Sequence, residues 1–340
     1  MNHIAIDLGS RESQICVRDS VGKILHEQKF ANPDLLELLN CPRAVVSMET
    51  CSEAFAVADA ARRKGHEVRV VPSTLVRSLG VGARGVKTDK RDAQALSEVS
   101  CRIDLPSVHV PSSWSRDVKT LCSLRDALVS SRTKCVNSVR GWLRAQLFRP
   151  RLARTTLPRK LREEYASRGQ ALPACVERQL VAIDGLREQI KAADVEIEER
   201  ARSSEICVLL MTAPGVGPQT AVRFAAALDG CDRFADAHRV ASYLGLAPGE
   251  DSSSTRKRIT SITKAGSASV RWLLVEAAWS ALRWRPDDPM CRWAKRVGER
   301  RGKKIAVTAL ARKLAGVLYA IWRTRKPYDP AHTTSTEPAV

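Results

Sequence analysis

The sequence lacks the features of membrane and secreted proteins. No apolar run approaches 18 residues, and the chain begins directly on a strand pattern rather than on a signal peptide. The ten cysteines include no CxxC pair, and several, such as Cys207, fall within apolar runs. This usage argues against a zinc centre and against a disulfide framework. It predicts buried, reduced thiols in a cytoplasmic protein.

Acidic residues are scarce late in the chain, and aromatic residues are few throughout. Residues 251–326 contain 19 Lys/Arg and only 5 Asp/Glu, whereas residues 1–105 contain 15 and 14. Aromatic residues make up 5% of the 340-residue chain, which has a formal charge of +19. A polyanion is therefore the expected partner of the basic part. The nearly neutral N-terminal part can host a site built from carboxylates.

The N-terminal part predicts one α/β domain over residues 1–105. Three adjacent antiparallel strands are expected over the segments HIAIDLGS, SQICVRD and KILHEQKF. Further buried strands are expected over RAVVSMET and HEVRVVPS, with helices before and between them and another after the Gly-rich loop. Mixed strands followed by alternating strand and helix are typical of an α/β fold.

Four carboxylates stand where such a fold forms sites. Asp7 and Glu49 each end a predicted strand, and Asp89 and Asp92 share one face at the start of a helix. Four hard oxygen ligands suit Mg²⁺ or Mn²⁺, and metals held by carboxylates promote in-line attack at phosphorus. In a second interpretation, Asp89 and Asp92 are only first-turn acids that suit the helix dipole. The IDLGS segment also resembles the first phosphate loop of the actin and sugar-kinase ATPases, but the second phosphate loop and the adenosine motif of those proteins are missing.

Residues 106–205 predict a helical region with a basic face. Apolar residues repeat every seven positions, which favours a coiled-coil seam between subunits and leaves open an amphipathic helix packed within one chain. The seam is formed by Val176, Ile183, Ile190 and Ile197, with Leu180, Leu186 and Ala193 between them. The preceding segment carries a run of basic residues whose net sign favours contact with a nucleic-acid backbone: Arg132, Lys134, Arg140, Arg144, Arg149, Arg151 and Arg154.

A Pro-Gly-Val-Gly turn, Pro214 to Gly217, joins two apolar helices after residue 206. It resembles a helix-hairpin-helix, in which glycines such as Gly215 and Gly217 let backbone N–H groups meet a DNA phosphate. The alternative is a tight turn between two packed helices.

A serine run follows in a polar segment. Ser252, Ser253 and Ser254 precede Arg256, Lys257 and Arg258, and Lys264 comes soon after. Neighbouring cations could stabilise a serine alkoxide and the phosphate that it attacks. A flexible serine-rich connector is the alternative. Apolar-periodic helices with basic faces continue to residue 326, and residues 327–340 are expected to be a disordered tail.

Together these pieces resemble the DEDD insertion-sequence transposases, relatives of the Piv DNA invertase that are now understood as RNA-guided serine recombinases. The resemblance covers nearly the whole chain, in the segments IDLGS, KTDKRDAQAL, APGVGPQTA, RFADAHRVASYLGLAPGEDSS and ITKAGSASVRWLLVEAA. By position it implies that Asp7, Glu49, Asp89 and Asp92 are the metal-binding acids. It also implies a nucleophilic serine, and Ser253 fits best, with Ser252 next. The chain departs from the family where it has SSST instead of Ser-Ser-Gly and Thr50-Cys51-Ser52 after the glutamate.

The resemblance implies an α/β RuvC-like domain of the RNase H type over residues 1–105, a helical coiled-coil region over 106–205 and a mainly α transposase domain over 206–326. It implies a homo-oligomeric enzyme, associated with the bacterial nucleoid, that cuts and rejoins donor and target DNA. A structured guide RNA, the bridge RNA, would pair with both. The alternatives are a RuvC-like nuclease or junction resolvase without a covalent intermediate, and a non-enzymatic nucleic-acid-binding protein.

Overall fold

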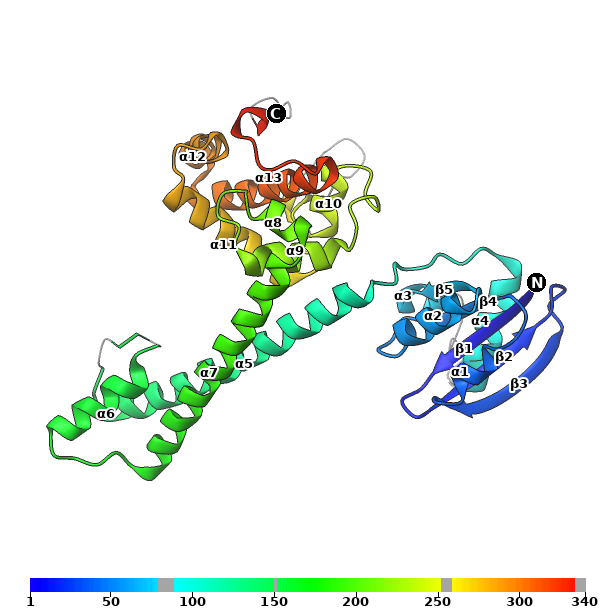
Figure 1. The fold of residues 1–340 in the computed structure, drawn as a ribbon, viewed down its shortest axis with the longest axis horizontal. Coiled ribbons are helices and arrows are strands. Elements are labelled where there is room, and N and C mark those ends of the chain that lie inside the picture. The colour runs from blue at the N-terminus through cyan, green and yellow to red at the C-terminus, as the bar shows by residue number, and fades with distance from the viewer. Residues whose placement is uncertain (79–88, 150–151, 154, 252–258, 334–340) are drawn as a thin grey trace. The chain divides into compact units, whose positions relative to one another are not determined.

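The computed structural model describes residues 1–78, 89–149, 152–153, 155–251 and 259–333. The chain divides into two compact units, Met1–Pro111 and Ser112–Val340 (Figure 1). The finer division predicted from the sequence, at residues 105, 205 and 326, stays a prediction.

The first unit is built on a mixed five-stranded sheet with the order β3-β2-β1-β4-β5. Its strands are β1 (Asn2–Leu8), β2 (Glu12–Arg18), β3 (Ile24–Ala31), β4 (Ala44–Glu49) and β5 (Glu67–Val71). β1, β2 and β3 pair antiparallel, as the sequence predicts, whereas β4 lies parallel to both β1 and β5. The mixed α/β architecture of the N-terminal part is thereby confirmed.

Helices cover both faces of the sheet, because alternate strand residues are apolar on each side. On one face Ile4 and Ile6 pack in a cluster with α2 (Ala54–Arg63) and the short α1 (Leu35–Leu38). On the other face Ala5 packs with Leu96 of α4 (Asp89–Arg102) and with residues of α3 (Ser73–Ser78). Strand residues of odd and even number in β1 therefore face different helices.

The second unit is almost wholly helical. A long pair, α5 (Ser113–Ala145) and α7 (Ala174–Arg202), packs side by side and carries α6 (Leu157–Ser167) at its far end (Figure 1). The other helices form the main core of the unit: α8 (Glu205–Leu210), α9 (Pro218–Leu228), α10 (Ala237–Tyr243), α11 (Ala268–Trp284), α12 (Pro289–Arg301) and α13 (Lys303–Thr324). A two-stranded ribbon, β6 (Pro248–Glu250) with β7 (Ile259–Ile262), completes it.

The heptad seam of α7 is filled within the chain. Val176, Leu180 and Ile183 are buried in a cluster with residues of α5 and α6, and Ile197 is buried in the main core. The structure thus supports the second interpretation of the heptads, an amphipathic helix packed in its own chain. A contact between subunits would need another surface.

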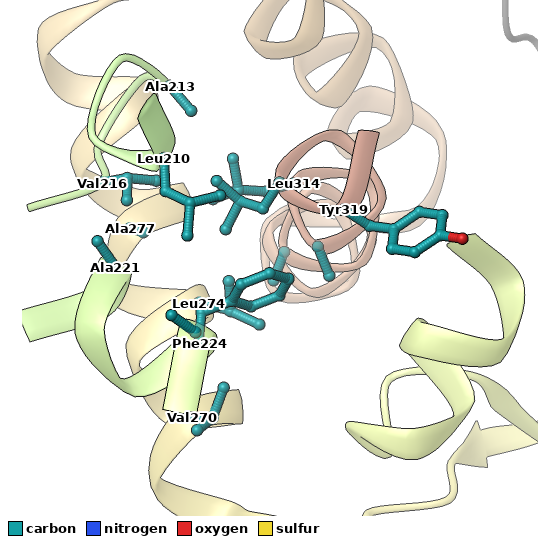
Figure 2. Close-up of a cluster of buried hydrophobic side chains, with 14 of the residues drawn as sticks. Leu210, Ala213, Val216, Ala221, Phe224, Val270, Leu274, Ala277, Leu314 and Tyr319 are labelled. Atoms are coloured by element: carbon teal, nitrogen blue, oxygen red, sulfur yellow. The ribbon is translucent and has the colours of Figure 1, made fainter. Parts of the chain in front are cut away.

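Helix α13 lies at the centre of the main core. It is long and apolar enough to cross a membrane by length and composition, the one such helix in the described part of the chain. Ten of its residues, however, are buried among neighbouring helices. Leu314 points toward Leu210 and the group that includes Phe224 of α9 and Leu274 of α11, whereas Tyr319 points to the other side of α13 (Figure 2), where its hydroxyl donates to the carbonyl oxygen of Phe234 over 2.7 Å.

The start of the predicted tail packs against the second unit. The backbone N–H of Tyr328 donates to Thr212 Oγ1 over 2.8 Å, and the Tyr328 hydroxyl lies 2.9 Å from Asp288 Oδ2. A short 3-10 helix follows over Pro330–Thr333.

Candidate active site

Two predicted acids end neighbouring parallel strands. In the register of β1 and β4, Ile6 lies opposite Met48, so Asp7 and Glu49 follow one step further along both strands. Ile6 and Met48 face the α2 side of the sheet. Because side chains alternate along a strand, Asp7 and Glu49 face the other side, which α4 covers.

Helix α4 runs so that its first turn lies at the same edge of the sheet. Near its end, Ser100 Oγ lies 2.9 Å from His3 Nδ1 at the start of β1 and 3.1 Å from Ser47 Oγ. From His3 to Asp7 the strand advances about 13 Å. From Ser100 back to Asp92 the helix advances about 12 Å. The start of α4, with Asp89 and Asp92, therefore arrives beside the carboxyl ends of β1 and β4.

The two aspartates of α4 differ in burial. Asp92 lies on the packed face of the helix and is only 8% exposed, whereas Asp89 is exposed. Within the described residues, no lysine or arginine pairs with the Asp92 carboxylate. A buried carboxylate without a cationic partner is costly, and a metal ion is one means of offsetting that cost.

Other charges close to this edge are paired with one another. Lys90 Nζ lies 3.0 Å from Glu27 Oε2 of β3, and Lys29 Nζ lies 2.7 Å from Glu12 Oε2. The hydrogen bond that Lys29 donates to Glu12 raises the pKa of Lys29, as do the charge of Glu12 and, to a smaller extent, the charge of Asp89. These two lysines are thus engaged by glutamates.

The four acids are of the chemical type that binds divalent metals. In the structure, however, their side chains are not gathered closely enough to bind one ion together. All four are carboxylates, the donors that Mg²⁺ and Mn²⁺ prefer. Across the residues described, no group of three or more His, Cys, Asp or Glu side chains is close enough to hold one ion. The four-acid metal site therefore stays a prediction, supported by the placement of its members on one edge and one face.

The two glycines of the PGVG turn have different surroundings. Gly215 has φ +77°, and a Cβ atom there would lie 2.1 Å from the carbonyl oxygen of Ala277 in α11. Gly217 ends the turn as the N-cap of α9, and no heavy atom lies within 4 Å of a Cβ built there. Gly215 is explained by packing against α11. Gly217 stands at the N-terminus of α9 with open space beside it, and its contact with a phosphate stays a prediction.

The serine run lies between the two strands of the ribbon. Glu250 of β6 pairs with Ile259 of β7, so the connecting segment leaves and returns at one point. The predicted nucleophiles Ser252 and Ser253 lie outside the described residues, as do Arg256, Lys257 and Arg258.

The loop after the ribbon is fixed by contacts that the sequence did not reveal. Arg271 Nη1 donates to the carbonyl oxygens of Leu244, at 3.0 Å, and Ala265, at 3.1 Å. The predicted phosphate ligand Lys264 is exposed in this loop, with φ +57°. The neighbouring Trp272 is 61% exposed, an unusual state for tryptophan. Trp272 directly follows Arg271, and this Arg-Trp pair was the sequence signal that could have drawn attention to the position.

Comparisons with known proteins match both the region of the four acids and the region of the PGVG turn and the serine run. A transposase family model for DEDD proteins of the IS110 type matches residues 4–147, which contain all four acids. The model of the Transposase IS116/IS110/IS902 family matches residues 207–290, which contain the PGVG turn and the serine run. The chain is 30% identical, over 313 residues, to the putative transposase y4rJ of Sinorhizobium fredii, covering 82% of this chain and 76% of the relative.

The chain belongs to the IS110 family of transposases.

The transposase is also similar to relatives along nearly its whole length. It is 27% identical to a probable family 20 transposase of Pseudomonas aeruginosa, over 97% of this chain and 99% of the relative. It is 27% identical to the transposase for insertion sequence element IS1111A of Coxiella burnetii, over 96% of this chain and 90% of the relative. As an insertion-sequence transposase it acts on DNA, and its family implies that it cuts and rejoins strands.

Proposed function

We propose that the transposase cuts and rejoins DNA at an active site formed by Asp7, Glu49, Asp89 and Asp92 together with a serine nucleophile. The observation that carries the proposal is the register of β1 and β4. It brings two acids to the ends of adjacent parallel strands, on the face that α4 covers, and the other two acids lie in the first turn of α4. The burial of Asp92 also supports the proposal, because an aspartate is rarely buried on the packed face of a helix unless its charge has a partner.

Divalent metal dependence is general for DEDD transposases. In this chain Asp7, Glu49, Asp89 and Asp92 would hold Mg²⁺ or Mn²⁺, and Asp92 would be the least accessible of the four. The bound cation would supply Lewis-acid polarisation of a DNA phosphate. The acids themselves would fix where that phosphate sits relative to α4.

The nucleophile we infer is Ser253, with Ser252 as the alternative. In the reaction, the serine hydroxyl gives up its proton and its Oγ forms a bond to phosphorus, while the bond from phosphorus to a deoxyribose oxygen breaks. The leaving oxygen takes a proton, so the reaction consumes no net proton. The phosphodiester bond energy is conserved, so rejoining by the reverse reaction needs no nucleotide cofactor. Arg256, Lys257, Arg258 and Lys264 would stabilise the negative charge that develops on the phosphate oxygens.

A guide RNA would recognise the DNA sequence by base pairing. The protein would then need to bind only the nucleic-acid backbones. The basic surface of α11 to α13 and the basic face of α5 suit phosphate contacts. The exposed side chains Trp272 and Trp284 each follow an arginine and suit stacking on unpaired bases. A homo-oligomer in which the acids of one subunit meet the serine of another would form a complete site.

The test compares wild type with Asp89→Asn in strand exchange on DNA that carries the ends of the element. Asp89 is exposed, so the substitution should leave the melting temperature within about 2 °C of wild type, as for most surface changes. We expect strand exchange to fall at least about 1,000-fold in the variant and to stop in wild type treated with excess chelator. Exposed Asp34→Asn is the matched control and should keep full activity. Strand exchange at the wild-type level in Asp89→Asn or in chelator would contradict the proposal.

A further inference from the structure

The far end of the helical pair α5 and α7 carries a pocket that the transposase chemistry does not use. The pocket has a volume of about 420 Å³, within the range of about 300–1,000 Å³ typical of small-molecule sites. We call it the arm pocket. It is lined by Arg140, Leu143, Arg144, Phe148, Arg149, Leu152 and Leu157.

The arm pocket contains three guanidinium groups and no carboxylate. Arg140 is held in place, since its Nη2 donates to the carbonyl oxygen of Leu152 over 2.9 Å. In the described part of the chain, no acidic side chain forms an ion pair with Arg140, Arg144 or Arg149. Three clustered, uncompensated positive charges favour an anion, and a planar guanidinium matches a phosphate in a bidentate manner.

The two glutamates of α6, the helix that contributes Leu157 to the pocket, are engaged with other arginines. On α6, Glu163 Oε1 lies 2.8 Å from Arg159 Nη1, and Glu164 Oε1 lies 2.5 Å from Arg168 Nη2. Arg162 of α6 pairs instead with Glu177 and Asp184 of α7, so these acids too are engaged with arginines outside the pocket. The positive charge of the pocket is a local excess and not half of an ion-pair network.

The other walls of the arm pocket are apolar and partly aromatic. Leu143 and Leu157 are buried in the core below it, and the half-buried Phe148 ring is backed by the Arg168 guanidinium, 4.8 Å from the ring centre. A phosphate alone would need no such wall. A nucleotide would, because its base can lie against an aromatic ring while its phosphate meets the arginines.

We propose that the arm pocket binds one unpaired nucleotide of a nucleic-acid strand, with the phosphate held by Arg140, Arg144 and Arg149 and the base against Phe148. The inference rests on the proposed function only in taking a nucleic acid as the partner. A base within a duplex is stacked on both sides and cannot enter, so the pocket selects strands with unpaired positions. RNA and DNA share this chemistry.

The experiment measures the affinity of the full chain for three fluorescein-labelled probes by anisotropy at one fixed salt concentration. The probes are a single-stranded RNA, a single-stranded DNA of the same sequence and the DNA duplex, each about 20 nucleotides, longer than sites of ~4–16 nucleotides. The charge variant combines Arg144→Ala with Arg149→Ala. Its control combines Arg178→Ala with Lys191→Ala, which removes two exposed charges from α7, outside the pocket and outside the basic run of α5.

The charge variant should bind a single strand about 100-fold more weakly, about tenfold for each charged hydrogen-bond donor. The control pair should lose less than about threefold. Loss with the RNA alone or with the DNA alone would support the proposal and identify the strand. Equal losses in the charge variant and the control would overturn it, because the pocket would then be only part of a general basic surface.

The base contact is tested with Phe148→Leu, which keeps an apolar side chain in the wall and removes the ring. We expect a loss of about fivefold or more with single strands and none with the duplex. The same loss with the duplex would contradict an unpaired base in the pocket. Melting temperatures of all variants show whether the fold is retained. Failure of these tests would leave strand exchange and its dependence on Asp89 unaffected, so the two proposals fail separately.

Discussion

At the residue scale, the two glycines of the PGVG turn have different roles, and Gly215 is required for helix packing. Its positive φ and the closeness of the α11 backbone leave no room for a side chain. Gly217, two residues on, has an ordinary φ of −105° and open space around it. The same turn therefore contains one glycine required by the fold and one that is free to meet a ligand.

Gly215→Ala should destabilise the transposase by about 2–4 kcal/mol, because a Cβ atom would overlap the carbonyl oxygen of Ala277 and the backbone would be strained. Gly217→Ala should cost about 1 kcal/mol or less, the usual cost of alanine at an N-cap. Urea unfolding of the full chain measures both. Equal effects of the two substitutions would show that the turn does not pack against α11 as described.

The sequence revealed some of these residues and not others. Asp7 and Glu49 were found because a strand-end acid is visible in a one-dimensional pattern, and their common face follows from alternation along the strands. The contact of Gly215 with Ala277 was not predictable, because it joins residues 62 positions apart through the crossing of two helices. The arm pocket was visible only as a run of arginines, since its apolar walls come from α5, from α6 and from the segment between them.

At the scale of elements, an ion-pair network joins the helical pair to the main core. Arg223 of α9 is 8% exposed, and its Nη1 and Nη2 lie 2.7 and 2.8 Å from the two carboxylate oxygens of Asp126 in α5. Nearby, Asp194 of α7 accepts hydrogen bonds from Arg125 Nε over 2.9 Å and from Gln219 Nε2 over 2.7 Å. Helices α5, α7 and α9 are thereby fixed to one another by charge as well as by apolar packing.

Asp126→Ala should destabilise the transposase by about 2–4 kcal/mol, because it leaves the buried Arg223 guanidinium without its carboxylate. The matched control is Asp117→Ala, an exposed acid on the same helix, which should change the free energy of unfolding by about 0.5 kcal/mol or less. Chemical denaturation of both variants provides the comparison. If the two substitutions cost the same, the Arg223 pair contributes no more than a surface charge.

The elements themselves were largely predictable, whereas their partners were not. Alternating apolar residues gave the three antiparallel strands, and heptads gave the apolar stripe of α7. A heptad stripe does not say which helix covers it, and here α5 of the same chain does so. The parallel pairing of β4 with β1 depends on a crossover through α1 and was equally absent from the local pattern.

At the scale of the whole molecule, the distribution of charge separates the nearly neutral sheet unit from the basic helical unit. Positive charge on this scale attracts nucleic acid by releasing counterions, independently of sequence. Residues 106–154 and 256–326 are the expected contact regions. This feature was read directly from the composition, because net charge needs no knowledge of the fold.

Affinity for nucleic acid should therefore fall steeply with salt. If the protein makes about 6–10 phosphate contacts, the association constant should drop by about 10³–10⁵ between ~50 and ~200 mM salt. A titration of the full chain against duplex DNA at several salt concentrations gives the slope. A nearly flat response would show that the basic surface is not the binding surface.

The central claim is that a serine in the run after Glu250 becomes joined to DNA. The most direct measurement traps the protein on cut DNA by denaturation during the reaction and detects a covalent adduct by gel shift and mass spectrometry. The account predicts an adduct with wild type and with Ser252→Ala, and none with Ser253→Ala. An adduct lost in Ser252→Ala and kept in Ser253→Ala would identify Ser252 as the nucleophile instead. An adduct that persists in both variants, or is absent from wild type that exchanges strands, would contradict the account.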